Sequence, residues 1–195
     1  VSTGIGCPSA AIAVEELVEA GADTLIRVGS SGSMQPYIHT GDVVVVSAAI
    51  RDEGTTPYYL PIEFPAVADI EVVTALREAA LRLGVKSHTG VSQSKDSFYG
   101  EVERTRMPMA ARLAERWNAF IAGGAACSEM ESSALFILSS LYRKRAGGVM
   151  LVINESDLAE TDEDDAAKHM AEFDADSVIK VAVEALKILI EADRR

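Results

Sequence analysis

The chain has few cysteines, few histidines and no long apolar run, and each shortage excludes a class of protein. Its two cysteines, Cys7 and Cys127, are too few and too far apart for a disulfide framework or a zinc pattern. None of the three histidines, His39, His88 and His169, lies in a nucleophile motif or at metal-ligand spacing. No uncharged apolar stretch approaches the roughly 18 to 20 residues that span a bilayer. The first residues lack the pattern of a signal peptide, so we expect a soluble protein of the reducing cytoplasm.

Positive charge is also scarce, because 18 Lys and Arg stand against 30 Asp and Glu, for a net charge of -12. A nucleic-acid partner is not expected, since such binding relies on Lys and Arg to neutralise phosphates. Residues 155–176 alone carry -9 and leave -3 for the rest of the chain, so a small anionic substrate can be bound elsewhere. The acidic stretch is expected to form a solvated loop and a helix start. It lacks the glycine of a calcium-binding loop, so no metal site is expected there.

Short apolar runs alternate with helical patterns, which predicts a single α/β domain over residues 1–195. Runs rich in β-branched residues and bounded by glycine or turn residues predict strands at 24–28, 42–47, 87–94 and 148–153. Helical spacing predicts helices at 9–20, 69–83, 109–122, 129–143 and 176–192. Ligands of such folds usually bind at the carboxyl ends of the strands, so residues that follow strands are the first candidates for a site.

A glycine- and serine-rich segment, Gly29 to Gly32, follows the first predicted strand and comes two residues after Arg27. Glycine allows close backbone approach, and hydroxyl and N–H groups can face an anion, so the segment is a candidate phosphate loop. An ordinary turn is the alternative. The segment matches neither the Walker loop nor the dinucleotide fingerprint, which favours a ligand smaller than a dinucleotide.

The sequence CSEMESS places two carboxylates, Glu129 and Glu131, between small and apolar segments. A buried carboxylate is costly unless it is hydrogen-bonded or paired, so two of them suggest a polar ligand. Further upstream, the sequence DSFYGEVERTR combines Phe98 and a tyrosine with two arginines. An aromatic ring and a guanidinium suit a flat ring with carbonyl groups, although a loop aromatic with solvated charges is the alternative.

Taken together, these features resemble the nucleoside phosphorylases of the uridine phosphorylase type. The stretches that carry the resemblance, in the family's order and spacing, are STGIGCPSAAIAVEEL, IRVGSSGSMQPYIHTGDVVV, LPIEFPAVADIEVVTAL, KDSFYGEVERTRMP and SEMESSALF. The resemblance implies the nucleoside phosphorylase fold, a mixed sheet that forms a distorted barrel flanked by helices, in a hexamer built from dimers. It also implies reversible phosphorolysis of uridine in pyrimidine salvage, with inorganic phosphate as co-substrate and no cofactor.

The resemblance further implies roles for the phosphate and ribose ligands. Arg27 and Ser30 match the family's phosphate ligands. Glu131 matches the residue that takes the ribose 2′- and 3′-hydroxyls, Met130 packs on the sugar, and Glu129 assists at the 2′-hydroxyl. No covalent intermediate with the enzyme is implied.

The base loop departs from the family's pattern. Phe98 matches the residue on the base, but Glu101 or Val102 stands where uridine-specific members carry a glutamine. Arg104 and Arg106 compete for the arginine that reads the base. A nucleoside phosphorylase of different base preference is therefore an alternative.

Three further expectations concern the ends of the chain. Ile5 and Ser9 match a monovalent-cation site at the dimer interface of some members, and Glu155 lies near a position where purine-cleaving relatives carry an acid. Glu155 alternatively opens the acidic loop and has no catalytic role. The family's N-terminal segment, with further phosphate ligands, is absent from this sequence. A catalytically silent nucleoside-binding paralogue or truncated subunit is therefore the second alternative.

Overall fold

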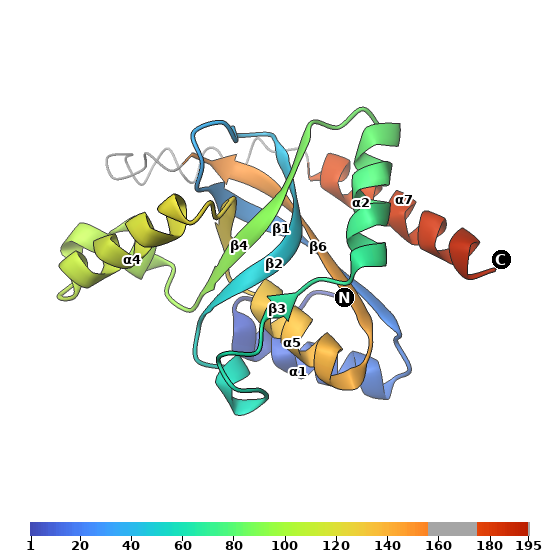
Figure 1. Ribbon diagram of the computed structural model, residues 1–195, viewed down its shortest axis with the longest axis horizontal. Helices are drawn as coiled ribbons and strands as arrows, with labels where there is room; N and C mark the ends of the chain where they lie inside the picture. Colours follow the sequence, from blue (N-terminus) through green and yellow to red (C-terminus); the bar gives the residue numbers. More distant parts are fainter. Residues whose placement is uncertain (156–174, 195) are drawn as a thin grey trace.

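The structure, a computed structural model, describes residues 1–155 and 175–194. Its centre is a closed ring of five strands in the order β2-β4-β5-β1-β6, closed by pairing of β2 with β6 (Figure 1). A two-residue strand, β3 (Ala66–Val67), pairs with β2 at Ala48 and Ala49. The ring strands are β1 (Thr24–Ser33), β2 (Val43–Asp52), β4 (Ser87–Lys95), β5 (Cys127–Glu129) and β6 (Arg145–Asn154). Parallel and antiparallel pairs are mixed, which confirms the expected α/β fold with a distorted barrel.

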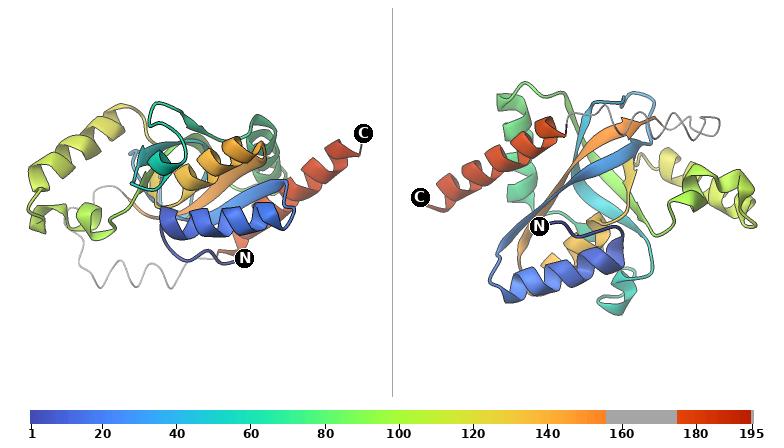
Figure 2. Two further views of the ribbon diagram at one scale, coloured as in Figure 1. Left: turned by 90° about the horizontal axis from the view of Figure 1, so that it is seen from below. Right: turned by 180° about the vertical axis from the view of Figure 1, so that it is seen from behind.

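Helices cover the barrel in two layers, which Figure 2 shows from two further directions. On one side α1 (Cys7–Glu19) and α5 (Ser132–Tyr142) pack together, and on the other α2 (Ile70–Arg82) packs with α7 (Asp176–Asp193). The third group consists of α3 (Tyr99–Val102), α4 (Ala110–Ala122) and the 3-10 helix η2 (Arg104–Arg106), and it projects away from the barrel. A further 3-10 turn, η1 (Thr56–Tyr58), follows β2.

The run of four valines in β2 explains why both helical layers are needed. All four side chains are fully buried. Because side chains alternate along a strand, Val44 and Val46 pack with the α1 and α5 layer, whereas Val43 and Val45 pack with the α2 and α7 layer. The strand is therefore apolar on both faces, as the continuous hydrophobic sequence indicates.

Two sequence-based boundaries are wrong. The segment from Gly29 to Gly32 is not a loop, because β1 continues to Ser33 and pairs with β6 along its length. Residues 127–129 form the short strand β5, so the helix expected from residue 129 begins at Ser132. In both places hydrogen bonding to neighbouring strands determines the backbone conformation, although the residues themselves have little preference for strands. The other predicted strands and helices are confirmed, with shifted ends.

Most of the acidic stretch, residues 156–174, lies outside the described residues, so the expected solvated loop is not assessed there. His169 falls in the same range. Within residues 1–155 and 175–194, no helix is long and apolar enough to cross a membrane.

Candidate active site

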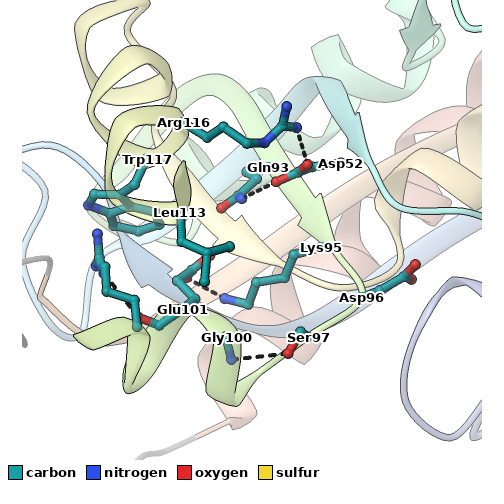
Figure 3. A pocket seen from close by; sticks show the side chains of 11 residues that line it. Asp52, Gln93, Lys95, Asp96, Ser97, Gly100, Glu101, Leu113, Arg116 and Trp117 are labelled. Atoms are coloured by element: carbon teal, nitrogen blue, oxygen red, sulfur yellow. Dashed lines mark hydrogen bonds and ion pairs between the residues drawn. The ribbon is translucent and has the colours of Figure 1, made fainter. Parts of the chain in front are cut away.

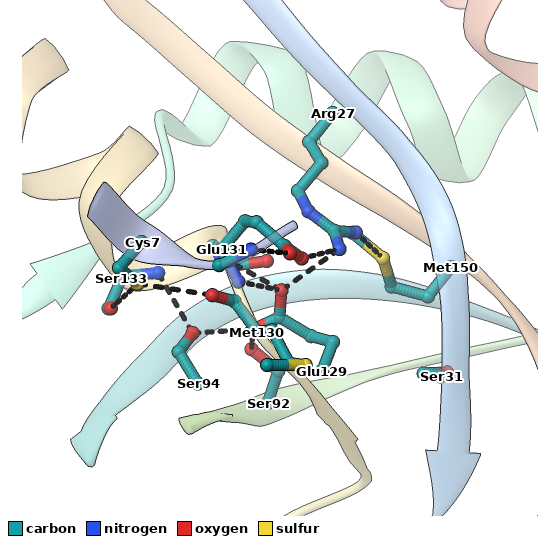
Figure 4. Close-up of polar contacts among 12 residues, drawn as sticks. Cys7, Arg27, Ser31, Ser92, Ser94, Glu129, Met130, Glu131, Ser133 and Met150 are labelled. Atoms are coloured by element: carbon teal, nitrogen blue, oxygen red, sulfur yellow. Dashed lines mark hydrogen bonds and ion pairs between the residues drawn. The ribbon is translucent and has the colours of Figure 1, made fainter. Parts of the chain in front are cut away.

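The two carboxylates lie at the junction of β5 and α5, and the first of them is fully satisfied by protein groups. Glu129 ends β5, and its side chain has no exposed surface. Its Oε1 accepts hydrogen bonds from the hydroxyls of Ser92, at 3.2 Å, and Ser94. Its Oε2 accepts from the backbone N–H groups of Glu131 and Ser132, both at 2.8 Å (Figure 4). Glu129 therefore fixes the start of α5 and the backbone of the second carboxylate.

Arg27 brings a positive charge to both acids from the middle of β1. Its Nη2 forms an ion pair with Glu131 and lies 3.4 Å from Oε2 of Glu129, while its Nη1 contacts the sulfur of Met150. Burial by itself lowers the pKa of the Arg27 guanidinium, but the charges of Glu129 and Glu131 outweigh burial and raise that pKa above its ordinary value. The guanidinium is thus a permanent cation, and the cluster of three side chains carries one net negative charge.

The start of α1 closes the site from the opposite direction. The backbone N–H of Gly6 donates to Oε1 of Glu131, so both oxygens of this carboxylate have a protein partner. The thiol of the next residue, Cys7, lies 3.2 Å from the carbonyl oxygen of Met130 and 3.3 Å from the hydroxyl of Ser133. Burial raises the pKa of the Cys7 thiol to about 12, so it is protonated at neutral pH and is not a nucleophile.

Gly29, which the sequence places in the candidate phosphate loop, lies directly beside the Arg27 guanidinium. An added Cβ there would lie 2.3 Å from Nη1 of Arg27, so only glycine leaves room for the guanidinium to fold along the strand. The close approach follows from strand geometry, because residues two apart lie on the same face of a strand. Ser30, in contrast, is exposed, and strand alternation places its side chain on the face opposite to Arg27. The structure does not bring these two expected phosphate ligands together.

The expected base loop lies beyond the end of β4. The ring of Phe98 is 48% exposed and makes an edge contact with Tyr99, with ring centroids 5.4 Å apart. Glu101 points away from solvent and forms an ion pair with Lys95, and the Lys95 ammonium lies 6.0 Å from the centre of the Phe98 ring. Ser128 joins this pair through hydrogen bonds to both charged groups. Lys95 was not selected from the sequence, because its contact with Ser128 depends on the pairing of β4 with β5.

The two arginines of the loop have different surroundings. The Arg104 guanidinium stacks over the indole of Trp117, 4.6 Å from its centre, and burial lowers the pKa of Arg104. Arg106 is exposed and pairs with Glu103. A cavity of about 190 Å³ lies beside Arg104 (Figure 3). Arg104 lines this cavity, whereas Arg106 does not.

The remaining candidates lie apart from this cluster. The hydroxyl of Ser9 donates to the carbonyl oxygen of Thr3, and the side chain of Ile5 is 78% exposed. Glu155 lies 3.4 Å from Nδ1 of His39, and both side chains are about half exposed. In the part of the chain that the structure describes, no group of three or more His, Cys, Asp or Glu side chains could hold a metal ion.

Comparison with known proteins identifies relatives along nearly the whole chain. The family model of the phosphorylase superfamily matches residues 1–192. A uridine phosphorylase of Treponema pallidum is 49% identical over 99% of this chain and 73% of the relative. A uridine phosphorylase of Escherichia coli is 40% identical over 100% of this chain and 74% of the relative. A guanosine phosphorylase of Halorubrum lacusprofundi is 34% identical over 96% of this chain and 75% of the relative.

Proposed function

The chain belongs to the phosphorylase superfamily, and from this premise we propose that it is a uridine phosphorylase, a pentosyltransferase that converts uridine and phosphate to uracil and ribose 1-phosphate. The observation that carries the proposal is the 49% identity to a uridine phosphorylase over 99% of the chain. The Arg27 and Glu131 pair supports it, because a cation and a carboxylate acceptor side by side suit a phosphate and a sugar diol.

In the proposed reaction, an oxygen of phosphate attacks the anomeric carbon of ribose. The bond from this carbon to N1 of uracil breaks, and its electron pair leaves with the base, which then takes up a proton. No covalent bond to the protein is needed. This agrees with the two cysteines, because burial raises the pKa of Cys7 and of Cys127 to about 12. Catalysis then rests on positioning and on charge stabilisation.

Within this reaction we assign Arg27 to phosphate and Glu131 to the ribose hydroxyls. Glu131 is 10% exposed, whereas Glu129 is completely buried and its two oxygens accept four hydrogen bonds from protein groups. The Glu129 carboxylate therefore serves best as a positioning residue for Glu131. Met130, between them, packs against the sugar. Ser30 stays a predicted phosphate ligand, although its side chain lies on the face of β1 opposite to Arg27.

The test is release of uracil from uridine with and without phosphate. We expect release only with phosphate, and we expect Arg27→Met to reduce kcat/KM by about 100-fold or more, since a charged contact of the attacking group is lost. Arg27→Lys is the matched variant, because it keeps the positive charge but lacks the planar guanidinium that can donate two parallel hydrogen bonds. Uridine binding in calorimetry without turnover would instead favour the silent nucleoside-binding subunit.

A second candidate is a phosphorylase of different base preference. It is favoured by Glu101 or Val102 in place of the expected glutamine and by the 34% identity to a guanosine phosphorylase. A panel of uridine, thymidine, cytidine and inosine with phosphate separates the two candidates. The highest kcat/KM on inosine would replace the uridine assignment.

We also propose a cytoplasmic homo-oligomer, a hexamer built from dimers, that acts in pyrimidine salvage. The exposed apolar side chains of Ile5 and Ile12 near the start of α1 support an interface there. A monovalent cation near Ile5 and Ser9 is part of this proposal. Light scattering after size-exclusion chromatography, in potassium and in choline buffers, tests both the hexamer and its dependence on the cation.

A further inference from the structure

We infer that Cys7 is a positioning residue for Glu131: its thiol holds the peptide group between Met130 and Glu131 in the orientation that aims the Glu131 carboxylate at the ribose hydroxyls. The inference rests on the proposed function, which gives these hydroxyls to Glu131, and deepens it. It assigns a role to a buried thiol that takes no part in the bond changes of the proposed reaction.

The peptide group between Met130 and Glu131 is held at both of its polar ends. The Cys7 thiol donates to the Met130 carbonyl oxygen, with 3.2 Å between sulfur and oxygen. The N–H of Glu131, which belongs to the same peptide group, donates to Oε2 of Glu129 at 2.8 Å. The group lies between the last residue of β5 and the first residue of α5. Because a peptide group is planar, fixing its two ends fixes the direction in which the Glu131 side chain leaves the backbone.

The surroundings of the thiol direct its proton to this carbonyl. The Ser133 hydroxyl lies 3.3 Å from the Cys7 sulfur, but it donates its own proton to the Glu53 carboxylate at 3.2 Å. The Cys7 side chain is fully buried, and burial raises the pKa of its thiol to about 12, so the proton stays on the sulfur at neutral pH. A thiol is a weak donor, so the contact orients the peptide group and contributes little to stability.

The residue before Cys7 contacts the Glu131 carboxylate directly. The N–H of Gly6 donates to Oε1 of Glu131, while Oε2 pairs with Arg27 (Figure 4). Gly6 has a φ of 90°, a conformation that favours glycine. The first turn of α1 therefore holds Glu131 twice, through the thiol at its backbone and through the Gly6 N–H at its side chain.

Loss of the thiol should release one end of the peptide group. A rotation of this group turns the Glu131 side chain away from its present direction, and a hydrogen bond weakens steeply when its angle is poor. The effect should therefore fall on the recognition of the ribose hydroxyls, which a cavity elsewhere in the core would not change.

The test compares uridine with 2′-deoxyuridine, which lacks one of the two hydroxyls assigned to Glu131. We expect kcat/KM of the wild-type protein to favour uridine by about tenfold or more, the range of one hydrogen bond to a charged group. In Cys7→Ala this ratio should fall to within about threefold of one, because only uridine loses a contact. Cys7→Ser keeps a donor at nearly the same place, so it should retain a ratio within about twofold of the wild-type value.

The matched control is Cys127→Ala. Cys127 is also fully buried, and burial also raises its pKa to about 12, but its side-chain hydrogen bond is with Ser31. Both alanine variants leave a small cavity and should lower the melting temperature by similar amounts, whereas only Cys7→Ala should change the ratio.

Three outcomes would contradict different parts of this assignment. If Cys7→Ala keeps the wild-type ratio, or if Cys7→Ser or Cys127→Ala lowers it equally, the thiol only fills space and the inference is overturned. A wild-type ratio near one would overturn the assignment of Glu131 to the hydroxyls, on which the inference rests. Failure of the wild-type protein to cleave uridine with phosphate would instead overturn the proposed function itself.

Discussion

Two glutamates two residues apart have different surroundings, and this difference supports the different roles proposed for them. Glu129 is fully buried and satisfied by two serine hydroxyls and two backbone N–H groups. Glu131 is partly exposed and shares its oxygens between Arg27 and the N–H of Gly6. Only Glu131 can exchange a protein partner for a ligand without leaving a buried charge unpaired.

Glu131→Gln tests this assignment. A neutral amide is a weaker acceptor for ribose hydroxyls and no longer neutralises Arg27. Hydrogen bonds to charged groups contribute roughly 1.5 to 3 kcal/mol, so we expect kcat/KM for uridine to fall by about 10- to 100-fold with folding retained. Steady-state kinetics and circular dichroism measure the two quantities. Unchanged turnover in this variant contradicts the role given to Glu131.

Gly29→Ala tests the space beside Arg27. The new methyl group would lie 2.3 Å from Nη1, so the guanidinium must move, and we expect KM for phosphate to rise by about tenfold or more. Gly54→Ala is the matched control, because its Cβ would meet Asp96 at an ordinary 3.6 Å. Equal phosphate KM values in the two variants would show that Arg27 does not need this space.

At the scale of elements, the sequence predicts structure well where apolar residues are periodic. The valine run of β2 and the stripe of α7 are such cases. Prediction from the sequence fails where the local conformational preference of the residues disagrees with the strand pairing of the folded protein. Gly29 to Gly32 have the composition of a turn but form part of β1, and the three residues of β5 are too short to show a period.

The sequence predicts which residues belong to the candidate site, but it does not predict which of them contact one another. Arg27 and Glu131 are 104 residues apart, and only the closed barrel places them in contact. The same holds for Ser128, which links Lys95 to Glu101. No local pattern encodes such contacts, because they depend on the register of neighbouring strands.

The start of α2 gives a test at this scale. The Asp69 carboxylate accepts from the N–H groups of Glu71, at 2.9 Å, and Val72, at 3.3 Å. Asp69→Ala should therefore lower the free energy of unfolding by about 1 kcal/mol, because two helix N–H groups lose their acceptor. Asp69→Asn keeps a capping oxygen, so it should lower the free energy of unfolding by only a few tenths of that value. Urea unfolding measures both, and equal losses would show that capping is not the cause.

At the scale of the whole molecule, Asp42 lies where the barrel closes. It precedes β2, and its carboxylate accepts from Lys86 at 2.8 Å, from the N–H of His39 at 3.0 Å and from His88 at 2.9 Å. Burial by itself raises the pKa of Asp42, but these hydrogen bonds outweigh burial and hold the pKa below its ordinary value. The ionised carboxylate therefore stabilises the junction of β2 with β4.

The sign of the shift gives a pH dependence. A carboxyl group with a lowered pKa in the folded state stabilises above its unfolded pKa of about 4, and the effect disappears as pH falls through the folded value. Asp42→Asn should lower the free energy of unfolding by about 1 to 2 kcal/mol at pH 7 and by clearly less near pH 3. Urea midpoints at both pH values measure the difference. Glu191→Gln, an exposed acid on α7, should show no such trend, and a pH-independent loss in Asp42→Asn would refute the linkage.

The contact between Arg27 and Glu131 competes with the ligands proposed for these two side chains. Under the proposed assignment, phosphate bound to Arg27 would release Glu131 for ribose, and a nucleoside bound to Glu131 would release Arg27 for phosphate. We therefore expect the two substrates to bind with positive cooperativity. Because such coupling is reciprocal, the factor by which phosphate tightens nucleoside binding equals the factor by which the nucleoside tightens phosphate binding. We expect such an enzyme to hold either substrate weakly alone and to bind both tightly only when they are present together.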